Sequence, residues 1–115
     1  MKYLLFVFFV VAVFGSVFAR LAKNGEPVTA STRSAAEFYA KNCATCHGKD
    51  GRAKTFKAKF NHARDLTDPE WQDQVSDERI FNSITNGKGK MPAFGKKLAE
   101  QEIDALVAYV RGLKK

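Results

Sequence analysis

The sequence predicts a small all-α domain, and three observations support this prediction. Four segments carry helix-capping residues, apolar residues at helical spacing, or both. No segment alternates apolar and polar residues in the way that is typical of a half-buried strand, and no internal repeat is present. The chain of 115 residues has the length of one domain. We therefore expect about four to five helices and no sheet.

Residues 1–19 are predicted to be a secretory signal peptide that is cleaved. Lys2 gives a positively charged start, residues 4–14 form an unbroken apolar run, and Val-Phe-Ala at residues 17–19 is typical of a cleavage site. An uncleaved anchor is the alternative, but the apolar run is shorter than the roughly 20 residues that span a bilayer. We expect export by a Sec-type signal to the periplasm, with no stable membrane insertion after cleavage.

After cleavage, we expect a loose leader at residues 20–33 and one domain at residues 34–115. Gly25 and Pro27 interrupt the leader, which shows no apolar period. The full sequence carries a formal net charge of +7. A basic protein can bind nucleic acid, but an exported protein seldom meets it. We therefore expect acidic protein partners and no nucleic acid.

The first helix is predicted to begin at Ser34 and to run into the cysteine motif described below. Ser34 and Glu37 are spaced as a capping box, in which each side chain satisfies a backbone N–H of the first turn. Phe38 and Tyr39 are expected to face the core.

The middle of the chain is predicted to hold three short helical segments. Residues 48–64 contain glycines among lysines and alanines, and we expect a loop there with one short helix. Asp68 and Pro69 are typical of a helix start. Ser76 is placed to cap the next helix, and Gly87 is placed to end it.

The last helix, from about Glu100 to Leu113, has the clearest pattern. Four apolar residues fall at positions i, i+3, i+4 and i+7, which predicts one buried stripe. These residues are Ile103, Leu106, Val107 and Val110.

Residues 43–47 read Cys-Ala-Thr-Cys-His, which is the attachment pattern of a c-type haem. Cys43 and Cys46 would lie on the same side of a helical turn, so both sulfurs can form thioether bonds to one porphyrin edge. His47 would then take one axial position on the iron. These are the only two cysteines in the sequence. We therefore expect one covalently bound haem c.

Three other uses of the two cysteines fit less well. A thioredoxin-like redox pair expects a βαβ context, and no such pattern is visible. A zinc site would need two further Cys or His ligands at regular spacing, and His62 is the only other histidine. A disulfide would close a very short loop and add little stability.

Met91 is the predicted sixth ligand of the iron. A thioether is a soft, weak ligand that suits haem iron opposite a histidine. Pro92 would stiffen the backbone beside it, and Gly89 would let the loop approach the haem closely. A core methionine is the alternative, but a loop rich in Gly and Lys is a poor place for a core residue. His62 is the rival ligand, and its polar neighbours predict a surface position.

In these residues the chain resembles the class I monohaem cytochromes c, and among them the small bacterial c6-like and cbb3-type subunit III-like cytochromes. The resemblance covers residues 34–115. It rests on the haem motif, on the segment Gly-Lys-Gly-Lys-Met-Pro-Ala-Phe and on the final helix Glu-Ile-Asp-Ala-Leu-Val-Ala-Tyr-Val-Arg. It implies a small cytochrome c fold wrapped around one haem, with the first and last helices crossing. Ala35 and Tyr39 on the first helix, and Leu106 and Tyr109 on the last, stand where the family has its contact residues.

The sequence departs from the family pattern at two points. Many members have a Gly-Pro after the haem motif, whose backbone carbonyl accepts the Nδ1 proton of the axial histidine. Here the prolines stand only at positions 27, 69 and 92, so the sequence does not identify this acceptor. Ala99 stands where a Ser or Thr cap usually begins the last helix, so we expect that end to fray.

The function that the resemblance implies is one-electron transfer by a soluble monomer, not catalysis. With His47 and Met91 both on the iron, no coordination position is open to a substrate. One alternative is a haem enzyme or gas sensor in which Met91 is only structural. Another is an electron-transfer subunit of a dehydrogenase or oxidase complex.

Two further sets of residues belong to this interpretation. Four lysines beside the Met91 loop are expected to ring the exposed haem edge and to favour redox partners with acidic docking surfaces; they are Lys88, Lys90, Lys96 and Lys97. The candidate lining of the haem pocket consists of Phe56, Phe60, Leu66, Trp71, Ile80, Ile84, Phe94 and Leu98.

Overall fold

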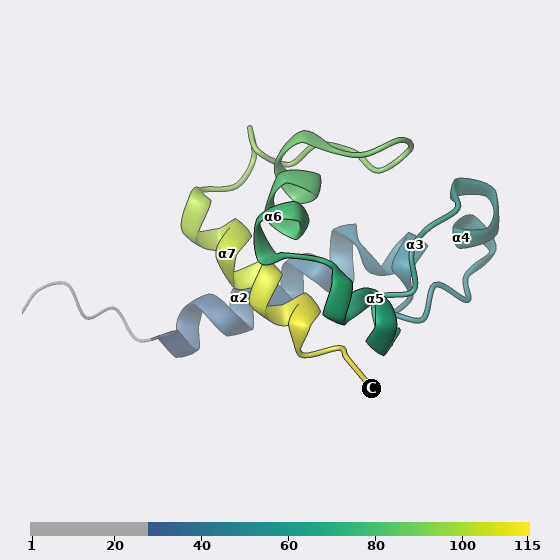
Figure 1. The fold of residues 1–115 in the computed structure, drawn as a ribbon. Helices are drawn as coiled ribbons and strands as arrows, with labels where there is room; N and C mark the ends of the chain where they lie inside the picture. The colour runs from purple at the N-terminus through teal and green to yellow at the C-terminus, as the bar shows by residue number, and fades with distance from the viewer. Residues whose placement is uncertain (1–27) are drawn as a thin grey trace, which may run out of the picture.

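The computed structural model describes the backbone from Val28 to Lys115 and the side chains from residue 35 onward. The predicted signal peptide therefore lies outside the described residues. Between residues 28 and 115 the chain is helical, without a strand, which confirms the all-α fold class. In chain order the helices are α2 (Val28–Asn42), α3 (Ala44–His47), α4 (Phe56–Asn61), α5 (Pro69–Gln74), α6 (Asp77–Asn86) and α7 (Glu100–Arg111) (Figure 1).

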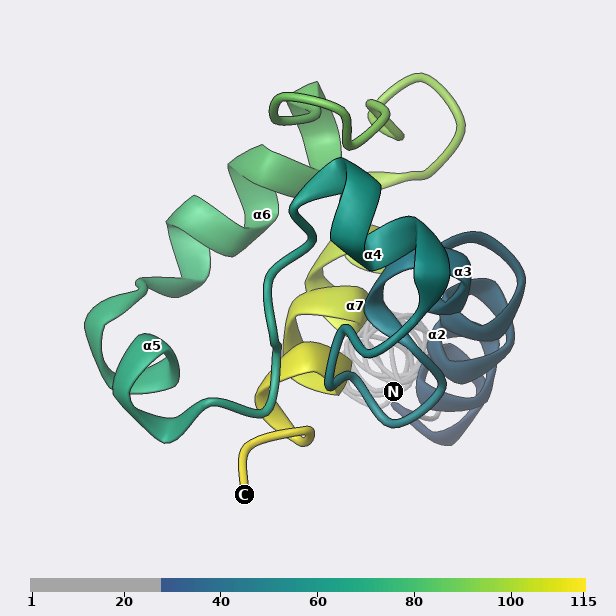
Figure 2. The ribbon, with the colours of Figure 1, turned by 90° about the vertical axis from the view of Figure 1, so that its right-hand side faces the viewer.

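The first and last of these helices pack against each other. Figures 1 and 2 show α2 and α7 side by side, with α6 on the other side of α7. On α2, the exposed fractions of Ala35 and Tyr39 are 4% and 2%, and on α7 that of Leu106 is 2%. The ring centroids of Tyr39 and Tyr109 are 4.9 Å apart. The predicted crossing of the terminal helices is confirmed.

The start of α2 differs from the prediction. The helix begins at Val28, so Ser34 lies inside it and the predicted helix start at Ser34 was wrong. Residues 28–33 contain neither Gly nor Pro, so nothing in them interrupts a helix once it has formed.

Side-chain caps begin α4, α5 and α6, and those of α5 and α6 are the predicted residues. The Thr55 hydroxyl accepts a hydrogen bond from the Ala58 N–H at 3.0 Å and begins α4. The Asp68 carboxylate accepts from the first turn of α5, and the Ser76 hydroxyl accepts from the Arg79 N–H at 3.2 Å at the start of α6. These contacts satisfy backbone donors that have no partner within the helix.

The start of α7 has a cap that the sequence analysis missed. The Ala99 methyl group cannot accept a hydrogen bond, but the Glu102 carboxylate accepts one from the Ala99 N–H at 2.8 Å. This contact is half of a capping box, and it satisfies the first backbone donor of the helix.

The core lies among α2, α6 and α7 and includes the predicted stripe of α7. Its buried members are Ala35, Tyr39, Ala44, Leu66, Ile80, Ile84, Phe94, Ile103, Leu106, Val107 and Val110. Trp71 and Leu98 pack against it. Phe56 and Phe60 do not, because their side chains are 76% and 61% exposed. Of the eight residues predicted to line a pocket, these two are the ones that the structure leaves at the surface.

Candidate haem site

The cysteine motif forms a single tight turn at the end of α2. The helical conformation is interrupted at Cys43 and resumes in α3. The Cys43 carbonyl accepts hydrogen bonds from the Cys46 N–H at 3.2 Å and from the His47 N–H at 2.9 Å. Both cysteines are unpaired and half-buried. The turn therefore places two thiols and one imidazole within a few residues of one another.

The environment of Cys43 does not suit thiolate chemistry. Burial, and to a smaller extent the neighbouring Cys46, raise the pKa of the Cys43 thiol to about 11. Redox-active and zinc-binding cysteines depend on the thiolate, which a lowered pKa favours. In the part of the chain that the structure describes, no three His, Cys, Asp or Glu side chains are grouped so that they could hold a metal ion. The raised pKa, which favours the neutral thiol, disfavours the thioredoxin-like alternative.

The ring of His47 is held by a backbone carbonyl that lies far away in the sequence. Its Nδ1–H donates to the carbonyl oxygen of Arg64 at 2.9 Å. Since a neutral imidazole carries one N–H, this bond leaves Nε2 with the lone pair that can bind a metal. Arg64 is the acceptor that the sequence analysis could not locate.

The fold brings Arg64 to His47 through two features of the loop. His62 ends α4 in the left-handed conformation, with φ 52°, and turns the chain back. The Leu66 N–H then donates to the Gly51 carbonyl at 2.8 Å, so the chain passes close to the motif. The residue in the left-handed conformation after a helix is usually Gly. Because His stands here instead, the sequence did not predict this turn.

Tyr39 ties the motif to the crossing of the terminal helices. Its hydroxyl donates to the carbonyl of Gly48 at 2.9 Å, and its ring packs against Tyr109. Burial is the main reason that the pKa of Tyr39 is raised well above its usual range. Tyr39 therefore stays neutral and keeps donating this bond across ordinary pH.

Helix α4 is attached to the motif at Cys46. The Thr55 hydroxyl donates to the Cys46 carbonyl at 2.9 Å. The Asn61 side-chain amide donates to the Cys46 sulfur at 3.5 Å, which is a normal distance for a sulfur acceptor. The two ends of α4 are thus both fastened to the same cysteine.

The loop that carries Met91 depends on glycine. Gly87 ends α6 with φ 74°, and a Cβ atom there would lie 2.6 Å from the Met91 carbonyl oxygen. Lys88 and Met91 exchange two backbone hydrogen bonds, of 3.1 and 3.0 Å. The Met91 side chain is half-buried and packs against the core. The loop is therefore an ordered turn with a partly accessible thioether.

This loop and α4 lie together at one end of the molecule. The Lys90 ammonium group donates to the carbonyl of Phe60 at 3.0 Å. The other candidate ligand, His62, has an exposed side chain, and its backbone N–H is used to end α4.

Comparison with known proteins identifies the family. Residues 30–110 match the family described as "Cytochrome C oxidase, cbb3-type, subunit III". The chain belongs to the c-type cytochromes. As such it is a haem electron-transfer protein, and its cofactor is a covalently bound haem c.

Three of its relatives illustrate the breadth of the family. The cbb3-type cytochrome c oxidase subunit FixP of Azorhizobium caulinodans is 40% identical over 74% of this cytochrome, which spans only 28% of FixP. Cytochrome c6 of Aphanizomenon flos-aquae is 38% identical, and the match covers 70% of this chain and 88% of that protein. Among solved structures, the KustC0563 c-type cytochrome has a TM-score of 0.65 at 41% identity, covering 70% of this cytochrome and 98% of its own chain.

The residues of this cytochrome fit a haem c. Two thiols on one turn can supply the covalent links, and the anchored imidazole of His47 can supply an axial nitrogen. Met91 offers a thioether on a loop that is fastened to the same region through Lys90. The donor set thus contains the two attachment groups and the nitrogen and sulfur ligands that haem iron accepts.

Acidic and basic residues of the cytochrome lie on different segments of the chain. Nine of its 12 Asp and Glu residues fall within residues 65–78 and 100–104, which contain no Lys or Arg. Lys88, Lys90, Lys96 and Lys97 are all exposed around the Met91 loop. The loop is therefore basic, whereas α5, the start of α6 and the start of α7 are acidic.

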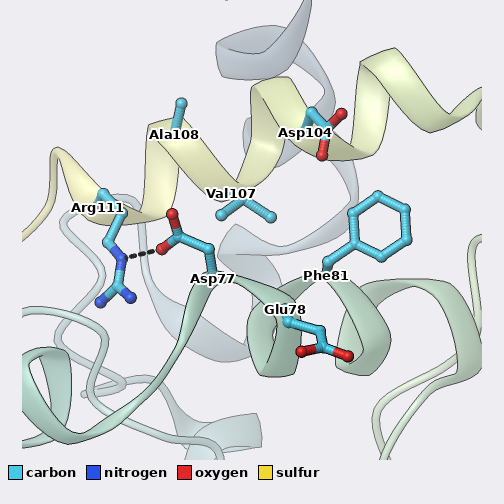
Figure 3. A pocket seen from close by; sticks show the side chains of 7 residues that line it. All are labelled: Asp77, Glu78, Phe81, Asp104, Val107, Ala108 and Arg111. Carbon is cyan, nitrogen blue, oxygen red and sulfur yellow. Dashed lines mark hydrogen bonds and ion pairs between the residues drawn. The ribbon is translucent and has the colours of Figure 1, made fainter.

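A shallow hollow between α6 and α7 is separate from the motif. Figure 3 shows Val107 of α7 and Phe81 of α6 in the space between the two helices, and the residues that line the hollow also include Asp77, Glu78 and Asp104. At one end of the hollow, the Arg111 guanidinium forms an ion pair of 2.6 Å with the Asp77 carboxylate. None of the predicted haem-binding residues lines this hollow.

Proposed function

We propose that this cytochrome is an exported one-electron carrier in which Cys43 and Cys46 bind the haem covalently and His47 and Met91 are the axial ligands of its iron. The observation that carries the proposal is the hydrogen bond from His47 Nδ1 to the Arg64 carbonyl, next to two cysteines on the same turn. This bond fixes the tautomer and orientation of an imidazole in the way that ligands of metals are usually held.

Met91 is favoured over His62 by their positions. The Met91 side chain is half-buried and packs against the core, whereas the His62 side chain is exposed. A bound haem supplies an iron that alternates between the ferrous and ferric states by one electron. A thioether opposite an imidazole favours the ferrous state more than a second imidazole does, and so raises the potential.

If His47 and Met91 both bind the iron, no coordination position would be left at which it could activate a substrate, so we infer that the protein is not an enzyme. The protein's part is to hold the ligands still and to exclude water, so that little reorganises when an electron moves. We further infer export by the predicted signal peptide to the periplasm, a monomeric state, and redox partners with acidic docking surfaces. No helix within residues 28–115 is long and apolar enough to cross a bilayer.

A second candidate function is that of an electron-transfer subunit in an oxidase complex. The match to FixP, a subunit of a cbb3-type oxidase, favours it. The two functions differ in whether the protein purifies alone.

The test is spectroscopy on protein purified from the periplasmic fraction. A low-spin ferric spectrum with the weak long-wavelength band of methionine–iron ligation, and no binding of carbon monoxide to the reduced form, is the expected result. A high-spin spectrum with carbon monoxide binding would instead identify an open sixth position and a haem enzyme or gas sensor. Co-purification with oxidase subunits would identify the second candidate.

A further inference from the structure

Helix α4 presents a pair of aromatic side chains to solvent. Phe56 and Phe60 are 76% and 61% exposed, and their ring centroids are 4.8 Å apart. Among the side chains from residue 35 onward, no other large hydrophobic one is exposed. A single exposed apolar residue is ordinary, but two neighbouring rings, here tilted by 56° to each other, form a contiguous apolar surface, which often marks an interaction site.

The orientation of α4 keeps this pair on the surface. Phe56 and Phe60 are four residues apart and so share one side of the helix. Ala58 lies on the opposite side, is 4% exposed, and faces the interior. Thr55 fixes the start of α4 and His62 fixes its end. The helix therefore cannot rotate to bury the rings without losing both caps and the contact of Ala58.

The aromatic pair sits next to both segments that we propose to hold the haem. Asn61 on α4 donates to the Cys46 sulfur at 3.5 Å. Lys90, the neighbour of Met91, donates to the Phe60 carbonyl at 3.0 Å. A protein seated on Phe56 and Phe60 would therefore lie close to a thioether link, where the path for an electron is short.

The surroundings of the pair are basic. Residues 49–64 contain six Lys or Arg residues and one acidic residue, Asp50, which is paired with Arg52 at 3.8 Å. Lys54, Lys57 and Lys59 are exposed beside the rings. An apolar centre with a charged rim is the usual anatomy of a protein–protein interface.

We propose that Phe56 and Phe60, with Lys54, Lys57 and Lys59 as their rim, form the docking surface for a redox protein whose own apolar contact patch is surrounded by carboxylates. The inference rests on the proposed electron-carrier function, to which it adds the location of the docking surface and an apolar contact patch on the partner. The rings supply the buried centre of the contact, and the lysines steer the encounter.

The test uses an acidic blue-copper protein as the probe partner. One electron passes from the reduced cytochrome to Cu(II), with no proton or atom transferred, and stopped-flow absorbance gives the second-order rate. The double variant Phe56→Ser/Phe60→Ser should lower this rate at least about tenfold, which corresponds to about 1.4 kcal/mol, because aromatic anchors at an interface centre often contribute at least that much. Phe56→Leu/Phe60→Leu, which keeps most of the apolar surface, should retain most of the rate.

Two controls separate docking from other effects of the substitution. Oxidation of the same variants by ferricyanide, which needs no protein interface, should proceed at the wild-type rate, and the potential and the absorption spectrum should not change. Lys57→Gln/Lys59→Gln should slow the reaction with the copper protein at low salt and lose its effect near about 0.1 M salt. The effect of the serine variant should persist there.

Two results would overturn the inference while leaving the electron-carrier function intact. One is a serine variant that reduces the copper protein at the wild-type rate. The other is a serine variant whose potential or spectrum shifts, because the rings would then contact the haem rather than a partner. A wild-type protein that reduces neither the copper protein nor ferricyanide would instead contradict the proposed function itself.

Discussion

The Nδ1–H of His47 donates to the backbone carbonyl of Arg64, 17 residues further along the chain, at 2.9 Å. This single bond links the cysteine turn to the loop after α4. A backbone acceptor cannot be removed by changing the Arg64 side chain, so the geometry is insensitive to most substitutions there. A hydrogen bond at this nitrogen raises the basicity of the other one and stabilises its bond to a metal.

The choice between Met91 and His62 can be tested with three variants. Met91→Ala should open the iron to carbon monoxide and lower the potential. Met91→His should keep six-coordination but also lower the potential, because a second imidazole favours the ferric state. His62→Ala should leave the spectrum unchanged. If His62→Ala abolished the low-spin spectrum and Met91→Ala did not, the two assignments would have to be exchanged.

Tyr39→Phe should lower the free energy of unfolding by about 1–2 kcal/mol, because the buried carbonyl of Gly48 loses its donor. Chemical denaturation would measure this loss. Tyr109→Phe is the control, since it keeps the ring contact between the two helices. Equal losses in both variants would mean that the hydroxyl bond of Tyr39 contributes nothing specific.

The stabilisation by the Tyr39 hydroxyl should depend on pH. Burial raises the pKa of Tyr39 in the folded protein above the ordinary value of about 10. The folded state thus holds this proton more tightly than the unfolded state does, so the stabilisation is complete below about pH 10 and is lost as the pH rises further. The stability difference between wild type and Tyr39→Phe should therefore shrink above about pH 10. A difference that stays constant up to pH 11 would contradict the raised pKa.

Arg111 should be one of the most sensitive positions outside the haem site. Its guanidinium donates to the carboxylate of Asp77, to the backbone and side-chain oxygens of Gln72, and to the Val75 carbonyl, at 2.6 to 2.9 Å. Arg111→Met should lower the free energy of unfolding by about 2–3 kcal/mol, because half-buried acceptors lose a charged donor. Lys114→Met breaks only an exposed ion pair with Asp73 and should cost at most about 1 kcal/mol. Similar losses in the two variants would show that the hydrogen bonds of Arg111 stabilise the fold no more than the exposed ion pair of Lys114 does.

The lysines of the Met91 loop are predicted to steer acidic partners. Replacing Lys88, Lys96 and Lys97 by Gln leaves the bond from Lys90 to α4 intact and should slow electron transfer to an acidic protein at low salt. The effect should fade near about 0.1 M salt, where the Debye length is about 10 Å. The matched control replaces three other exposed lysines, namely Lys41, Lys114 and Lys115. Equal slowing in both triple variants would attribute the effect to net charge alone.

Local signals in the sequence predicted local features well. Asp68 and Ser76 cap their helices as expected, because a cap depends only on the next few residues. The stripe of α7 is buried as its spacing predicts. The predicted helix start at Ser34 was wrong, because a capping-box sequence looks the same whether it begins a helix or lies inside one.

Features that depend on the tertiary fold could not be predicted. Nothing in the sequence marks the Arg64 carbonyl as the partner of His47, since every residue has a carbonyl and only the path of the loop selects one. The i, i+4 spacing of Phe56 and Phe60 predicts a shared face but does not say whether that face is buried, and here it is exposed. The assignment of Cys43, Cys46, His47 and Met91 to the haem remains a prediction.

Covalent attachment at this motif is tested most directly by the intact mass of the purified protein after extraction with acidified acetone, which removes haem that is not covalently bound. We expect the wild-type mass to equal that of residues 20–115 plus one haem. We also expect the variant with both Cys43→Ala and Cys46→Ala to lose the haem completely. A wild-type mass equal to the polypeptide alone, or a double variant that keeps its haem, would contradict the assignment of Cys43 and Cys46 as the attachment residues.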